Sequence, residues 1–150
     1  MDRRRLPAAL VLTLAAALAG PADAADGPVG LRCQIDREGG PSMFQVYRLD
    51  RAAGTVLAEP DTLYTAAGAP RDGEKITSVS YIDRWTDDEL VLRTEYRSRD
   101  LPYVATITSV FDLRTLIETG EYRWSGPVRF DRLPIGPNAC KRVSRESSGR

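Results

Sequence analysis

The sequence predicts an all-β protein, either an antiparallel sandwich or a small closed barrel of about eight strands. Three observations predict this class. Apolar residues recur with a period of two rather than 3.6 along most of the chain. Turn residues, mainly Gly, Pro and Asp, separate these stretches at short intervals. Two cysteines near the two ends of the β-rich part indicate that its first and last strands are neighbours.

Each predicted strand is bounded by such turn residues. The clearest strand spans residues 90–97, where apolar or hydroxylated side chains alternate with a more polar set. The reversal at 50–54 places Gly54 at a left-handed bulge position. Residues 59–73 contain two prolines and two glycines, so we expect a long loop there. The predicted strands are residues 31–36, 44–49, 55–58, 74–82, 90–97, 103–113, 117–124 and 128–132, followed by an irregular approach to a last segment at 139–143.

Cys33 and Cys140 are expected to form a disulfide, because an even pair in an exported protein is read first in that way. The loop that they close has slightly more than 100 residues, and the chain-entropy account values such closure at about 4–5 kcal/mol. A bond requires Cα atoms within about 7 Å. It would therefore lay the first strand beside residues 139–143. A nucleophilic cysteine is disfavoured because histidine, the usual base, is absent.

Residues 1–24 have the three parts of a secretory signal peptide. Arg3–Arg5 form a positive start, residues 6–18 are apolar, and Ala22–Ala24 form an Ala-x-Ala exit. The apolar run of about 13 residues is shorter than the roughly 20 that a membrane-spanning helix needs. We therefore expect a periplasmic or secreted protein with no stable membrane insertion after cleavage. The arginines leave both Sec and twin-arginine export open.

The rest of the chain is expected to form a single β domain at residues 25–143 and a flexible tail at 144–150. The 21 basic and 21 acidic residues balance, which argues against a nucleic-acid partner. The absence of histidine excludes His-dependent triads and ordinary catalytic zinc sites. We therefore expect no enzyme activity, no cofactor and no metal site.

The order of motifs resembles that of small exported bacterial β proteins of unknown function. The motifs are Cys33, "YRLDRAAGTV" at 47–56, "VFDLRTLIETGEY" at 110–122, and Cys140. In outline the chain is also similar to the periplasmic lysozyme-inhibitor barrels, whose Ser-Gly-x-x-Tyr loop enters the cleft of the target enzyme. The nearest string here is "SGPVRF", which has Arg129 where that family has tyrosine. The resemblance implies a small barrel that binds another protein.

The turn at residues 83–89 is unusual because it places four acids around a tryptophan. The spacing does not match a calcium-binding loop. Trp85 with Asp83, Asp87 and Asp88 is a candidate interaction surface, since an exposed tryptophan is a frequent interface anchor. The alternative is that Trp85 covers one end of the core while the acids stay solvated.

Arg93, Arg97 and Arg123 are a second candidate surface. On one sheet face they would form a patch for an acidic partner or a phosphate. A mixed, solvated face is the alternative, because acids lie near enough in sequence to neutralise the arginines across strands. These acids are Glu95, Glu118 and Glu121.

Together these patterns predict a binding or protein-interaction module of the cell envelope without catalytic activity. The alternative is a lipocalin-like carrier of a small apolar ligand in the barrel interior. The expected partner is thus an envelope protein or a small apolar ligand. A carrier requires an internal cavity, whereas an interaction module requires an exposed apolar patch.

Overall fold

The computed structural model describes residues 29–126 and 132–144, and all regular structure in these residues is β-strand. The all-β prediction is confirmed. The predicted signal peptide and nearly all of the predicted tail lie outside the described residues. Among the residues that are described, no helix has the length and apolar character needed to cross a membrane. The strands are β1 (Val29–Ile35), β2 (Met43–Asp50), β3 (Thr55–Ala58), β4 (Thr62–Thr65), β5 (Ala69–Asp72), β6 (Ile76–Trp85), β7 (Glu89–Ser98), β8 (Val104–Asp112), β9 (Ile117–Ser125) and β10 (Arg132–Val143).

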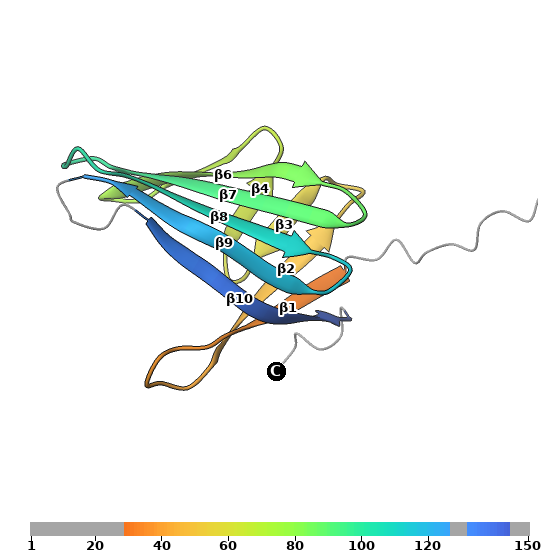
Figure 1. Ribbon diagram of the computed structural model, residues 1–150. Coiled ribbons are helices and arrows are strands. Elements are labelled where there is room, and N and C mark those ends of the chain that lie inside the picture. The colour runs from red at the N-terminus through yellow and green to blue at the C-terminus, as the bar shows by residue number, and fades with distance from the viewer. Residues whose placement is uncertain (1–28, 127–131, 145–150) are drawn as a thin grey trace, which may run out of the picture.

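The strands form a closed barrel rather than a sandwich (Figure 1). Neighbours in the sheet follow the order β4-β3-β2-β1-β10-β9-β8-β7-β6, and all pairs in this series are antiparallel. A parallel pairing of Thr65 on β4 with Tyr81 on β6 closes the ring. The short strand β5 pairs with the first half of β6, where Ala69 lies opposite Ser80. The barrel thus has nine strands, with one more strand beside it.

The first and last strands are neighbours, as the cysteines predict. Cys33 on β1 and Cys140 on β10 are register partners and form a disulfide, with their Cα atoms 3.9 Å apart. Cys33 is fully buried in the core. The bond therefore joins the two ends of the β domain from inside the barrel.

Two predicted irregular segments are strands in the structure. Residues 59–73 contain β4 and β5, where a long loop was expected. Pro70 lies on β5, which ends the sheet order, and proline is tolerated on such an edge because one side of the strand needs no donors. Residues 133–138 belong to β10, whose register shifts between Ile135 and Asn138. That shift accommodates Gly136, with φ +72°, inside the strand.

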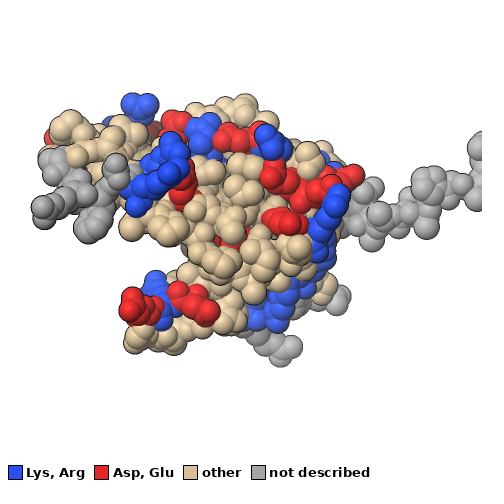
Figure 2. Space-filling view, in the orientation of Figure 1, with Lys and Arg blue, Asp and Glu red and all other residues tan. Residues whose placement is uncertain are grey.

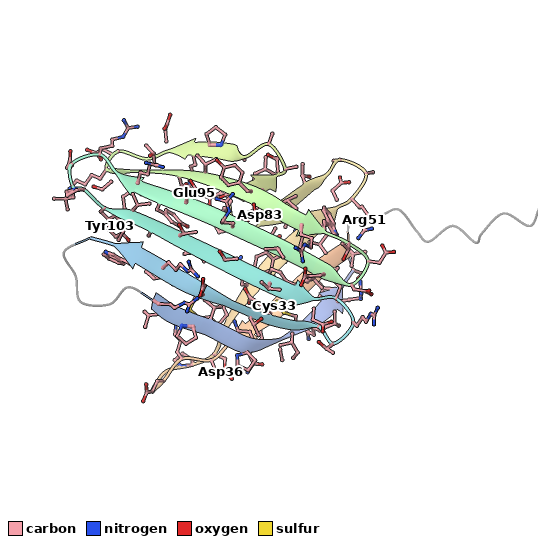
Figure 3. All side chains as sticks on the ribbon, turned by 45° about the horizontal axis from the view of Figure 1, so that its top comes forward. Cys33, Asp36, Arg51, Asp83, Glu95 and Tyr103 are labelled. Carbon is pink, nitrogen blue, oxygen red and sulfur yellow. A yellow bond between two sulfur atoms is a disulfide. The ribbon has the colours of Figure 1, made fainter. Side chains whose placement is uncertain are left out.

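One end of the barrel is filled by an apolar core. The buried cluster is Leu31, Cys33, Tyr47, Leu49, Val56, Ala58, Leu90, Leu92, Phe111 and Leu113. Trp85 and Leu116 pack against this cluster from the turns at that end, and the backbone N–H of Leu113 donates to the carbonyl of Asp88. Arg51 marks this closed end, whereas Tyr103 marks the opposite end (Figure 3). At the opposite end the β1–β2 hairpin projects away from the body (Figure 1).

Candidate functional site

The acidic turn after β6 has its charges paired. Trp85 packs on the core, and the Arg51 guanidinium lies 5.3 Å from its ring centroid. Arg51 also pairs with Asp87 at 2.8 Å, and the Arg93 Nε lies 2.7 Å from Asp83. Trp85 therefore packs against one end of the core, and the role of this turn as an interaction surface stays a prediction.

Asp88 is held in the same way by a neighbouring turn. The Nε of Arg114 donates to its Oδ1 at 2.6 Å, and this hydrogen bond holds the pKa of the Asp88 carboxyl below its ordinary value. The acids of the turn are therefore engaged within the protein.

The three candidate arginines lie on the outer face of the sheet, where acids accompany them. Arg93 pairs with Asp83 and Glu95 and lies over the Tyr81 ring, 4.3 Å from its centroid. Arg123 pairs with Glu121, and Arg97 is exposed on β7. Figure 2 shows blue and red side chains interspersed on this face. The structure therefore places these arginines on a face that also carries acids, and their role as an interaction surface stays a prediction.

Glu118 is absent from that outer face. The sequence grouped it with the acids that neutralise the arginines, but its side chain points into the barrel and is only 2% exposed. The reason is the alternation along β9: Glu118 and Tyr122 face inward, while Thr119 and Glu121 face outward. Glu118 therefore belongs to the barrel interior.

A cavity opens at the end of the barrel opposite Trp85. It has a volume of about 530 Å³ and lies between the end of β1, strands β2, β8 and β9, and the bulge of β10. Figure 2 shows the molecule hollowed between the projecting hairpin and the body. Its polar lining is Asp36, Tyr47, Ser109, Glu118 and Asn138, and its apolar lining is Ile35, Ile107, Pro134, Ile135 and Pro137.

The bulge of β10 shapes the wall of this cavity. Gly136 has φ +72°, and a Cβ there would lie 2.4 Å from the carbonyl oxygen of Glu118. Only glycine therefore fits both the backbone conformation and the close approach of the strands. After the bulge, Asn138 is the register partner of Glu118. The bulge thus aligns the two polar side chains in the interior.

Glu118 is the centre of a buried hydrogen-bond network. The Tyr47 hydroxyl donates to its Oε1 at 3.2 Å, and the Asn138 Nδ2 donates to its Oε2 at 3.0 Å. Burial, followed by the negative charge of Glu118, raises the pKa of Tyr47 well above its ordinary value. Tyr47 therefore remains a neutral donor across the physiological range.

Further hydroxyl groups continue this polar layer across the barrel. Ser80 Oγ and Thr94 Oγ1 lie 3.0 Å apart, and Thr94 Oγ1 donates to the Tyr64 hydroxyl at 3.2 Å. Burial raises the pKa of Tyr64. The interior is thus apolar at the closed end and polar in the middle. The barrel interior is therefore not entirely apolar.

Aromatic side chains line a second cavity near the start of β8. The Tyr103 and Tyr122 hydroxyls lie 2.8 Å apart, and the Trp124 ring packs 4.2 Å from Tyr103 between centroids. The cavity measures about 630 Å³, and exposed Ile76 and Leu101 contribute to its walls. The Trp124 Nε1 is buried and has no hydrogen-bond partner among the residues that the structure describes.

One group of potential metal ligands lies in the barrel among the described residues. Sulfur atoms of Cys33 and Cys140 and a carboxylate oxygen of Glu118 lie within 4.8 Å of one another. Both sulfurs belong to the disulfide, and metals bind thiolates rather than a disulfide. In its oxidised form this group does not hold a metal.

The sequence named Glu118 only as an acid of the outer face, and it singled out no residue of the Glu118 cavity as part of a binding site. Tyr47, Ser109, Glu118 and Asn138 come from four strands, so no local motif contains them. A usable pattern was present in β9. Its outward positions carry two charged side chains, which puts the remaining carboxylate on the inward face.

Comparisons with models of protein families, with curated proteins and with solved structures found no match for this chain. The resemblance to the lysozyme-inhibitor barrels therefore stays a prediction. Most of the string that carried it, residues 127–130, lies outside the described residues.

Proposed function

We propose that this protein is an exported binding protein that holds a small organic molecule in the Glu118 cavity. The observation that carries the proposal is the convergence of Tyr47, Ser109, Glu118 and Asn138 on one cavity of about 530 Å³. Small-molecule sites are typically concave, have mainly apolar walls and contain a few placed polar groups. The cavity at the open end of this barrel has all three properties.

The lining favours an amphipathic ligand over a fully apolar one. Ile35, Ile107 and Pro137 offer apolar contact, while the carboxylate of Glu118 and the hydroxyl of Tyr47 are already desolvated. A fully apolar ligand would leave the polar groups of the lining without new partners, which costs binding free energy. This refines the lipocalin-like carrier that the sequence offered as an alternative.

The compartment is part of the proposal. The disulfide between Cys33 and Cys140 suits an oxidising environment such as the periplasm or the extracellular medium. The arginine-led apolar segment at residues 1–24 supports the same assignment. Such a protein would meet its ligand outside the cytoplasm.

The test is to recover the protein from its natural compartment without denaturation, then to denature it and identify released small molecules by mass spectrometry. We expect one ligand to be released in stoichiometric amount. Ile135→Trp, which fills the cavity, should release little, whereas Leu133→Trp, two residues earlier and outside the cavity lining, should match the wild type. Equal release from both variants, or none from the wild type, would contradict the proposal.

An envelope protein-interaction module is the second candidate function, and the cavity beside Trp124 favours it. Leu101 is 68% exposed there, and the Trp124 N–H, which has no hydrogen-bond partner among the described residues, suits a carbonyl of a bound chain. In crosslinking from the native envelope, the wild type should give a reproducible crosslink to one partner protein. Leu101→Glu should abolish this crosslink. Leu63→Glu, a change of an exposed leucine on β4, should not. Loss with both variants, or with neither, would count against this surface.

A further inference from the structure

We propose that the ligand of the Glu118 cavity carries a positively charged nitrogen, such as a primary ammonium group, that binds the carboxylate of Glu118. This inference rests on the proposed function and names the chemical class of its ligand. Three observations carry it: the burial of Glu118 without a cation, the sign of the charges around the cavity, and the shape of its apolar walls.

Glu118 is a buried carboxylate whose partners are both neutral. Tyr47 and Asn138 each donate one hydrogen bond to it, at 3.2 and 3.0 Å. Across residues 29–126 and 132–144, neither lysine nor arginine pairs with it. A buried carboxylate is costly unless it is paired and fully hydrogen-bonded. Two donors use about half of its acceptor sites, so an arriving cation finds lone pairs free.

The charge of the cavity has one sign. Among the residues that the structure describes, Asp36 and Glu118 are the charged side chains of its lining, and both are acidic. Hydrogen bonds from Gln34 and Ser42 lower the pKa of Asp36, which keeps this carboxylate ionised at neutral pH. Asp36 is exposed and Glu118 is buried, and negative charge that lines a cavity attracts cations and repels anions. Both carboxylates would repel an anionic ligand, and no lysine or arginine among the described lining residues would offset this repulsion.

The walls favour an organic cation with an apolar body. Ile35, Ile107 and Pro137 line the same cavity as Glu118, so a carbon chain or ring can contact these walls while the nitrogen binds Glu118. A bare divalent ion is a poorer occupant, because Ca²⁺ wants six to eight oxygen ligands and these walls are largely carbon. Charge-assisted hydrogen bonds from an ammonium group are also the stronger kind.

The test uses three probes that share a phenylethyl body: phenethylammonium, 2-phenylethanol and 3-phenylpropionate. Isothermal titration calorimetry of the wild-type protein at pH 7 should show phenethylammonium binding at least about tenfold tighter than the alcohol. The carboxylate probe should show no binding. In Glu118→Gln, which keeps the side-chain size, affinity for the ammonium should fall by about tenfold while affinity for the alcohol changes by less than about twofold.

Glu121→Gln is the matched control, because Glu121 lies on the outward side of the same strand and binds Arg132. It should leave all three affinities within about twofold of the wild type. Near-equal affinities for all probes, with no effect of Glu118→Gln, would overturn the cation inference and leave the cavity function intact. A Glu118-dependent heat with CaCl₂ alone would also overturn it, in favour of a metal site. Failure of every probe, together with no extracted ligand, would overturn the proposed function itself.

Discussion

Asn138 and Glu118 face each other on β10 and β9, and the Nδ2 of Asn138 donates to the Oε2 of Glu118 across 3.0 Å. Asn138 is the first paired residue after the β10 bulge, so this hydrogen bond links the bulge, which forms part of the cavity wall, to β9. Both side chains are buried. The functional account depends on Glu118 remaining here as a carboxylate that only neutral donors contact.

Replacement of the Asn138 amide by a second carboxyl group tests the charge of the Glu118 side chain. In Asn138→Asp two carboxyl groups meet in the interior and hold one proton between them at neutral pH. Such a pair binds protons more tightly in the folded than in the unfolded state. Its cost is therefore small near pH 4 and rises as the pH increases. Urea unfolding should show a loss relative to wild type that is at least about 1 kcal/mol larger at pH 8 than at pH 5. A loss independent of pH would contradict the account.

Gly136 should be intolerant of a side chain. Gly136→Ala and Gly54→Ala both place alanine at a positive φ, so both lose about 1–2 kcal/mol from the backbone conformation alone. A Cβ at 54 has open space, whereas a Cβ at 136 lies 2.4 Å from the Glu118 carbonyl oxygen. We expect Gly136→Ala to cost about 1–3 kcal/mol more than Gly54→Ala in chemical denaturation. Equal costs would show that the strands do not approach so closely.

Buried and half-buried tyrosines should make the protein sensitive to alkali. Burial raises the pKa values of Tyr47, Tyr64, Tyr96 and Tyr122 in the folded state. In the unfolded chain tyrosine ionises near pH 10. Above about pH 10 the unfolded state therefore binds fewer protons, and the free energy of unfolding falls as pH rises toward the folded values. Urea unfolding between pH 8 and pH 11 measures this fall. It should be shallower in Tyr47→Phe, and a flat profile in the wild type would refute the prediction.

Loss of the disulfide should weaken the whole barrel. The bond closes 107 residues between Cys33 and Cys140, and removal of a native disulfide from a small domain costs about 2–5 kcal/mol. The double variant Cys33→Ala/Cys140→Ala should show this loss in urea unfolding, in one cooperative transition. If the double variant and the wild type unfold at the same urea concentration, the disulfide does not stabilise the pairing of β1 with β10.

The fold was largely predictable because local alternation marks its strands and two cysteines mark which strands close the sheet. The alternation in residues 90–97 predicts β7, and the spacing of Cys33 and Cys140 predicts the pairing of β1 with β10. The strands β4 and β5 and the first part of β10 were missed. Their prolines and glycines are typical of loops, whereas Pro70 lies on an edge strand and Gly136 lies at a bulge.

The site was not predictable in the same way. The two charged side chains on one face of β9 could place Glu118 on the other face, but only the folded sheet shows which residues of other strands meet it there. The cavity also needs the β10 bulge to align Asn138 with Glu118, and that register is a property of the folded sheet. The residues singled out by composition, Trp85 and its acids, instead close the opposite end.

A crystal structure of the protein grown with phenethylammonium tests the central claim most directly. The account predicts the ammonium nitrogen within about 3 Å of a Glu118 carboxylate oxygen, with the phenyl ring against Ile107 and Pro137. An amine that occupies the aromatic cavity beside Trp124, or one whose nitrogen points to solvent while Glu118 stays unengaged, would contradict it.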